Sequence, residues 1–323
     1  MRSLEDIYGG GLVLPGRGAG GRAAQPAPGD EPLDETGPMP GLGRSPTFPL
    51  PQWRARDPYR TVYFDAGGGR PLVFVHGLGG NATNWEFIAA PLADRYRVAG
   101  LDLAGCGWSR KPDVRYSVGL LRDHLLDFLE RRAIRRATLV GHSLGGAVCV
   151  AAALARPDLV ESLVLVCAAC LVPLPAWMRV GSRALLDRRV LYSLLTLGTE
   201  FILSNVFVDR EENNRYVRWF RRSSLRDEPG YPNLRDFARV GTHLCRSAVE
   251  TDFSGDFKSL RVPVLAIVGN HDRLTDIPAL LRHLDAVPRV RTVVIQRSGH
   301  MPMIERPEET LVHIERFLTD PPL

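Results

Sequence analysis

Short apolar and β-branched runs alternate with helix-like segments along most of this 323-residue chain, and this alternation constrains the fold more than any other feature. The run at 72–75 is apolar at every position, as expected for a strand in a sheet that is covered on both faces. We expect strands at 61–64, 72–75, 98–102, 137–141, 162–166, 262–268 and 292–295, and helices at 81–95, 117–132, 144–155 and 307–318. Strands that alternate with helices in this way indicate an α/β fold with a mostly parallel sheet.

The alternation stops near Cys170 and resumes at Val262. The stretch between them contains helix-like apolar runs, so we expect a helical cap at 171–250 between two parts of one core, 51–170 and 251–323. Residues 1–50 are rich in glycine and proline and poor in aromatic residues. Such a segment cannot bury enough apolar area to offset the entropy of ordering it, and we expect a mostly disordered tail.

Composition argues against several classes of protein. Apolar residues make up 45% and charged residues 24%, as in soluble globular proteins, and no apolar run approaches the about 18 residues needed to cross a bilayer. The net charge of +5 is small and dispersed, which argues against nucleic acid as a partner. Arg2 is followed by Glu5 and Asp6 without an apolar stretch, so we expect no secretion signal. Together with an odd number of cysteines, five, this favours reduced thiols and a cytoplasmic location.

Cys167 and Cys170 form a C-x-x-C pair at the end of the apolar run 162–166. A zinc site of this kind needs a second cysteine pair, which the chain lacks. We therefore interpret both cysteines as small buried apolar residues and expect no metal site.

The strongest chemical signal is the motif G-x-S-x-G at 141–145, between an expected strand and an expected helix. In that context Ser143 occupies a tight turn that lifts its hydroxyl above the sheet, and Gly141 and Gly145 remove side chains that would collide there. The helix that follows points its N-terminus at the site, which favours developing negative charge. Ser143 is therefore the candidate nucleophile.

A serine nucleophile needs a base, and the base needs an acid to orient it. His300 and Asp272 each follow the end of an expected strand, and such loops gather at one edge of a parallel sheet. We expect His300 to accept the serine proton and Asp272 to hold its tautomer. Asp276 is the rival acid, and the two other nearby histidines are His142, packed beneath the turn, and His271.

The glycine-rich loop at 76–80 directly follows the strand ending at Val75. A tetrahedral oxyanion needs two hydrogen-bond donors, and backbone N–H groups provide them without reorganisation. We expect the N–H groups of Leu78 and Leu144 to form this oxyanion hole. The loop lacks the spacing of either common phosphate-binding motif, which argues against a phosphate cradle.

These blocks together resemble the α/β-hydrolase superfamily from about residue 60 to the C-terminus. Residues 102–109 are similar to its D-x-x-G-x-G-x-S loop, which is usually structural, and 299–307 to its histidine loop. The resemblance implies an eight-stranded, mostly parallel sheet with helices on both faces, a helical cap after the sixth strand, and no cofactor.

Departures from subfamily patterns narrow the chemistry that the resemblance implies. Epoxide hydrolases and haloalkane dehalogenases have an aspartate where this chain has Ser143, and hydroxynitrile lyases use a lysine that the expected cap lacks. Carbon–carbon bond hydrolases typically have asparagine before the serine and tryptophan after the histidine, where this chain has His142 and Met301. The leading interpretation is an esterase or lipase. Thioesterases, perhydrolase-type enzymes and carbon–carbon hydrolases remain alternatives, as does an inactive receptor or scaffold, although such proteins usually lose triad residues.

The composition of the expected cap is consistent with a substrate that has an apolar acyl group, but packing of the cap onto the core explains the same residues. Apolar side chains there could line an acyl pocket or pack the cap onto the core: Leu185, Leu186, Leu191, Leu194, Leu195, Phe201 and Ile202. Residues 215–222 place three aromatic side chains at helical spacing beside arginines. A basic amphipathic helix of this kind can contact anionic lipid or an acidic substrate, or it can be an ordinary solvated helix. We expect a small-molecule ester as substrate, with peripheral lipid contact as an option.

Overall fold

The structure, a computed structural model, describes residues 57–171, 191–192, 199–208, 234–256, 259–284 and 289–322, with two short strands before them. These are β1 (Asp30–Glu31) and β2 (Trp53–Arg54), which pair antiparallel with each other. The rest of the expected tail at 1–50 lies outside the described residues. Within the described parts, no helix is long and apolar enough to cross a membrane.

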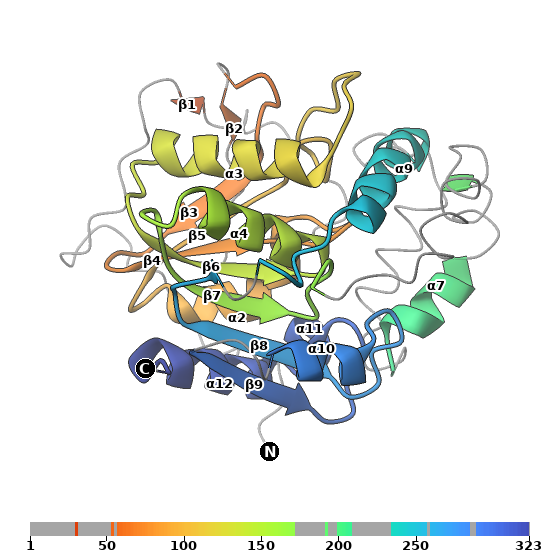
Figure 1. Ribbon diagram of the computed structural model, residues 1–323. Helices are drawn as coiled ribbons and strands as arrows, with labels where there is room; N and C mark the ends of the chain where they lie inside the picture. Colours follow the sequence, from red (N-terminus) through yellow and green to blue (C-terminus); the bar gives the residue numbers. More distant parts are fainter. Residues whose placement is uncertain are drawn as a thin grey trace, which may run out of the picture.

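A seven-stranded sheet forms the centre of the described core, in the order β3-β5-β4-β6-β7-β8-β9 (Figure 1). The strands are β3 (Tyr63–Ala66), β4 (Pro71–Val75), β5 (Arg97–Leu101), β6 (Ala137–His142), β7 (Val160–Val166), β8 (Val264–Gly269) and β9 (Val290–Ile295). Only β3, at one edge, runs antiparallel to its neighbour. The mostly parallel sheet is as expected, but the described residues give it seven strands and not eight.

Helices cover both faces of the sheet, and the side chains of β4 show why. Val73 and Val75 pack in one apolar cluster with residues of α3 (Val118–Arg131), α4 (Leu144–Ala155) and α10 (Ile277–Leu284). Leu72 and Phe74 point to the other face and pack in a second cluster. That cluster holds residues of η1 (Ala82–Trp85), α2 (Glu86–Leu92), α11 (Pro302–Glu305) and α12 (Pro307–Thr319). Successive residues of a strand face opposite sides, so an entirely apolar strand needs both layers.

Local signals place the helix ends close to where the sequence predicts them. The Ser117 hydroxyl accepts a hydrogen bond from the N–H of Leu120, 3.1 Å away, and so caps α3. The strand expected at 61–64 is shifted to 63–66 in the structure, so Asp65 belongs to β3. Its carboxylate is buried and forms ion pairs with Arg97 at 2.7 Å and Arg132 at 2.8 Å. These partners come from distant segments, so a residue typical of turns is accommodated within a strand.

Between β7 and β8, the described residues include the helices α7 (Thr199–Val206) and α9 (Leu234–Glu250). Figure 1 shows both beside the sheet edge at which the arrowheads of β7 and β9 end. They belong to the expected cap at 171–250, most of which lies outside the described residues. The same holds for Leu185, Leu186, Leu194 and Leu195, and for the basic segment 215–222.

Candidate functional site

The expected site residues all follow the carboxyl ends of parallel strands. The loop at 76–80 follows β4, Ser143 follows β6, Asp272 follows β8 and His300 follows β9. Because these strands are parallel, the four loops lie together at the carboxyl ends of the strands. This is the edge beside which α7 and α9 lie (Figure 1).

Ser143 occupies a strained turn between β6 and α4, with φ of 49° and ψ of −118°. A positive φ is costly for a residue with a side chain, and such conformations persist where surrounding contacts impose them. The Ser143 N–H donates to the carbonyl of Val166 at 2.9 Å, and its carbonyl accepts from Gly146 at 2.9 Å. A Cβ at Gly141 would lie 2.6 Å from the carbonyl oxygen of Gly145, so the turn requires glycine there.

The imidazole of His300 is hydrogen-bonded to the carboxylate of Asp272, with 2.9 Å between Nδ1 and Oδ2. The other carboxylate oxygen accepts from the N–H groups of Leu274 at 2.8 Å and Thr275 at 3.2 Å. Burial raises the pKa of Asp272, but the interactions with His300 and the hydrogen bonds from Thr275 and Leu274 together outweigh it and lower the pKa to about 2. Asp272 is therefore ionised and fixed in orientation.

Asp276, the rival acid, has a different role in the structure. Its carboxylate is exposed and accepts from the N–H of Ala279 at 3.0 Å, within the first turn of α10. It therefore caps that helix, as aspartate commonly does.

His300 is held against the serine turn by His142, the residue before Ser143. The two imidazole rings meet edge to face with centroids 4.8 Å apart, and His142 Nε2 lies 2.8 Å from the carbonyl oxygen of His300. Burial lowers the pKa of His142 to about 3, so the ring is neutral. Since a carbonyl only accepts, Nε2 carries the proton and donates. His271 is exposed and bonds to Asn270 instead.

The glycine loop at 76–80 also lies close to the serine turn. A Cβ at Gly77 would lie 3.0 Å from the Cβ of Ser143 and 2.7 Å from Nδ1 of His142, so only glycine allows this approach. The side chain of Leu78 is 38% exposed, and Leu144 is the first residue of α4. The first N–H groups of a helix have no partner within it, so the N–H of Leu144 needs no partner inside α4.

The D-x-x-G-x-G-x-S loop at 102–109 forms buried structural contacts with the glycine loop and the helix η1 that follows it. The buried carboxylate of Asp102 accepts from the N–H groups of Ala82 at 2.7 Å and Trp108 at 2.8 Å. Buried His76 links this loop to the glycine loop, because its ring accepts from the N–H of Leu103 at 3.0 Å and lies 2.7 Å from the carbonyl of Gly77. Burial lowers the pKa of His76 to about 4, in agreement with a neutral ring that donates through one nitrogen and accepts through the other.

Sequence reasoning missed the place of Cys167. Its thiol is buried and free, as expected, but its sulfur, an Asp272 oxygen and a His300 nitrogen lie within 4.8 Å of one another. These are donors that could hold a metal ion, and the only such set among the described residues. Burial and the neighbouring Asp272 carboxylate raise the pKa of the thiol well above its usual value. A protonated thiol beside a carboxylate that already binds His300 is a poor ligand set, so we assign no metal here.

Sequence reasoning also gave no role to Glu305, which follows the histidine by five residues. Its buried carboxylate accepts from the N–H of Gly299 at 2.7 Å and from the N–H of Val208 at 2.8 Å. In the sequence Glu305 is an acidic residue at the end of the apolar run 301–304, which does not indicate its partners.

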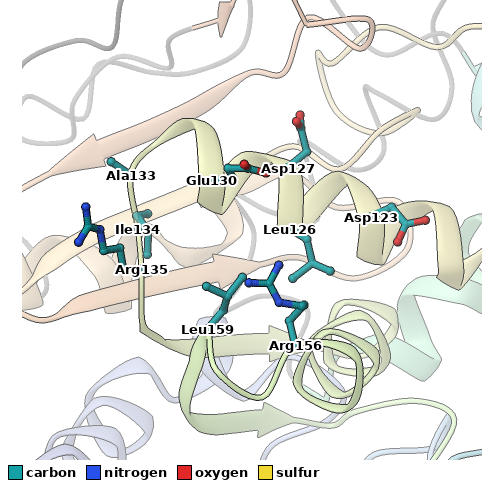
Figure 2. A pocket seen from close by; sticks show the side chains of 9 residues that line it. All are labelled: Asp123, Leu126, Asp127, Glu130, Ala133, Ile134, Arg135, Arg156 and Leu159. Carbon is teal, nitrogen blue, oxygen red and sulfur yellow. The ribbon is translucent and has the colours of Figure 1, made fainter.

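A pocket of about 560 Å³ lies at the other end of the sheet (Figure 2). Figure 2 shows its lining residues, which include Ile134 and Leu159, just before β6 and β7, Asp127 and Glu130 of α3, and Arg156. It faces the amino ends of the strands and has no contact with the serine turn.

Comparisons with known proteins agree with the fold described above. A model of the family described as alpha/beta hydrolase fold matches residues 70–307. A pimeloyl-[acyl-carrier protein] methyl ester esterase of Nitrosomonas europaea is 28% identical over 75% of this chain and 93% of its own. A 2-hydroxy-6-oxo-6-(2'-aminophenyl)hexa-2,4-dienoic acid hydrolase of Metapseudomonas resinovorans is 26% identical over 77% of this chain and 84% of its own. The solved structure of an esterase from Thermogutta terrifontis superposes with a TM-score of 0.70 at 22% identity, covering 84% of this chain and 97% of that one.

Proposed function

Because the chain belongs to the alpha/beta hydrolase fold family, we propose that it is a serine hydrolase that cleaves a carboxylic ester through an acyl-enzyme on Ser143. The observation that carries the proposal is the hydrogen bond of 2.9 Å between Asp272 and His300, beside the strained turn of Ser143. A histidine oriented by an ionised carboxylate next to a serine is the arrangement that activates a hydroxyl nucleophile.

In this mechanism the Ser143 hydroxyl attacks the ester carbonyl while Nε2 of His300 takes its proton. Asp272 holds the proton on Nδ1 and stabilises the imidazolium that forms. The N–H groups of Leu78 and Leu144 bind the oxyanion, and the N-terminus of α4 adds a favourable field. His300 then gives its proton to the leaving alcohol, and a water activated by the same histidine releases the acid.

The acyl group that fits the described surroundings is apolar. A Cβ built at Gly79, in the glycine loop, would lie 3.1 Å from the ring of Phe237 on α9. Phe237 packs with Leu191, Tyr192 and Ile202 around buried Ala238. An apolar cluster therefore lies against the loop that is proposed to bind the oxyanion, where the acyl chain of a substrate would extend.

Carbon–carbon bond hydrolysis is the second candidate, favoured by the Metapseudomonas resinovorans relative that matches most of the chain. Against it, His142 replaces the asparagine that typically precedes the nucleophile in such enzymes, and its ring is buried and bonded to His300. Thioester cleavage uses the same residues and differs only in the leaving group.

The test combines a label for the nucleophile with a substrate series. A fluorophosphonate probe should label the wild-type protein and not Ser143→Ala, which would also exclude an inactive scaffold. We expect turnover of p-nitrophenyl esters between acetate and palmitate, at rates above those for acyl-CoA thioesters and for a ring-cleavage dienoate. If the probe labels the protein but the dienoate is the only substrate that is turned over, the assignment changes to carbon–carbon bond hydrolysis.

A further inference from the structure

The C-terminal end of α7 is bonded directly to the loop that carries His300. The His300 N–H donates to the carbonyl oxygen of Val206 at 2.9 Å. The approach is close enough that a Cβ at Gly299 would lie 2.6 Å from the same oxygen. The main chain of His300 is thus held on both sides, by Val206 at its N–H and by His142 at its carbonyl.

Glu305 joins the same two segments a second time. One carboxylate oxygen accepts from Val208, two residues beyond Val206, at 2.8 Å. The other accepts from the N–H of Gly299, the residue before His300, at 2.7 Å, and lies 3.4 Å from the Ser298 hydroxyl. Glu305 is only 5% exposed, so water cannot replace these partners easily.

The position of this end of α7 is determined by the core. Leu203 and Phe207 are buried in the same apolar cluster as Met303 and Ile304, which directly precede Glu305. The C-terminal end of α7 is therefore held in place by packing in the core, and the histidine loop is hydrogen-bonded to this packed segment.

We infer that Glu305 is a positioning residue, which ties the end of α7 to the histidine loop and so fixes His300 relative to Ser143. The inference rests on the proposed function, because it assigns a role in that reaction. A carboxylate suits it because each of its two oxygens can accept from a different backbone segment. Displacement of a reacting group by about 1 Å can cost about 10²-fold in rate, so loss of either bond should be measurable.

The matched pair Val208→Pro and Val208→Ala isolates one of these bonds. The Val208 side chain is 44% exposed, so alanine changes little and keeps the N–H donor. Proline removes that donor, and any effect of its restriction of the preceding residue, Phe207, appears in the melting temperature. Glu305→Gln leaves one acceptor oxygen for two N–H donors. Its control is Glu161→Gln, because the Glu161 carboxylate pairs with Arg70, which is half-exposed.

The readout is the rate of fluorophosphonate labelling, normalised to the final labelled fraction and measured well below each variant's melting temperature. We expect Val208→Pro to label about 5- to 30-fold more slowly than Val208→Ala, which should stay within about twofold of wild type. Glu305→Gln should be at least as slow, and the double variant Val208→Pro/Glu305→Gln no slower than Glu305→Gln alone.

The outcomes separate this inference from the proposed function. A wild-type protein that is not labelled at all would overturn the proposed function. Wild-type labelling with equal rates for Val208→Pro and Val208→Ala would overturn the role of Glu305 alone. Lower melting temperatures with unchanged labelling rates would show a purely structural contact and also overturn it. If Glu305→Gln does not fold, the two Val208 variants still decide the question.

Discussion

His142 donates a hydrogen bond of 2.8 Å to the carbonyl oxygen of His300, and this bond joins the turn of the proposed nucleophile to the loop of its proposed base. We expect His142→Phe, which keeps a ring of similar size but removes the donor, to lower kcat about tenfold with a smaller change in KM. His142→Gln can still donate and should recover part of the rate. Steady-state kinetics with a p-nitrophenyl ester measures both, and equal rates for wild type and His142→Phe would contradict a positioning role.

The proposed acid is tested against its neighbour. Asp272→Asn removes the charge that orients His300 and should lower kcat by roughly 10²- to 10⁴-fold. Asp276→Asn keeps an oxygen that can cap α10, so kcat should change less than threefold and the melting temperature by little. A larger loss from Asp276→Asn than from Asp272→Asn would reassign the acid.

Stability should fall as the pH is lowered from about 6.5 to about 4. Burial lowers the pKa of three histidines from 6.5, to about 4 for His76 and His124 and about 3 for His142. The unfolded chain therefore takes up protons near pH 6.5 that the folded protein refuses, and the free energy of unfolding decreases. Burial raises the pKa of Asp102 from 3.8 to about 6 and also raises the pKa of Glu305, so these two carboxyl groups act in the opposite direction and offset part of the decline.

Urea unfolding between pH 7.5 and 4.5 measures this effect, with His142→Phe as the matched variant. Removing one of the three histidines should reduce the steepness of the decline by about one proton. An unchanged slope would mean that the folded protein protonates His142 as readily as the unfolded chain does.

The cysteines should be unreactive in the folded protein. All five thiols are free, and burial raises their pKa values, to about 12 for Cys106 and Cys170 and about 11 for Cys245. Disulfide reagents react with the thiolate form of cysteine and not with the protonated thiol. We expect a disulfide reagent at pH 8 to modify less than one thiol per chain before denaturation and all five after it. Only three reactive thiols after denaturation without reductant would instead indicate a disulfide.

The parts of the structure that follow from local patterns could be predicted from the sequence. The helix at Leu144–Ala155 has the expected bounds, because the glycine motif before it and the alanine-rich repeat within it are both local signals. The proximity of Asp272 and His300 also follows from the sequence, since each lies in the loop that follows a strand of one parallel sheet.

Contacts between distant segments could not be predicted in this way. The bond between Val208 and Glu305 joins residues 97 positions apart, and that between His142 and His300 joins residues 158 apart. No periodicity or motif encodes such pairs, because they depend on how loops meet after the sheet has formed. Asp65 is a further case, where ion pairs to Arg97 and Arg132 override the preference of aspartate for turns.

The most direct test of the account is to trap the acyl-enzyme. The protein is mixed with a p-nitrophenyl ester, quenched with acid in the pre-steady state, and analysed by intact mass and peptide mapping. We predict a mass increase of one acyl group, located on Ser143. Ser143→Ala should show no adduct, on the order of 10³-fold or more lower kcat, and an unchanged melting temperature. Turnover by the wild type without an adduct would contradict the central claim. So would a Ser143→Ala variant that keeps more than a tenth of the wild-type activity.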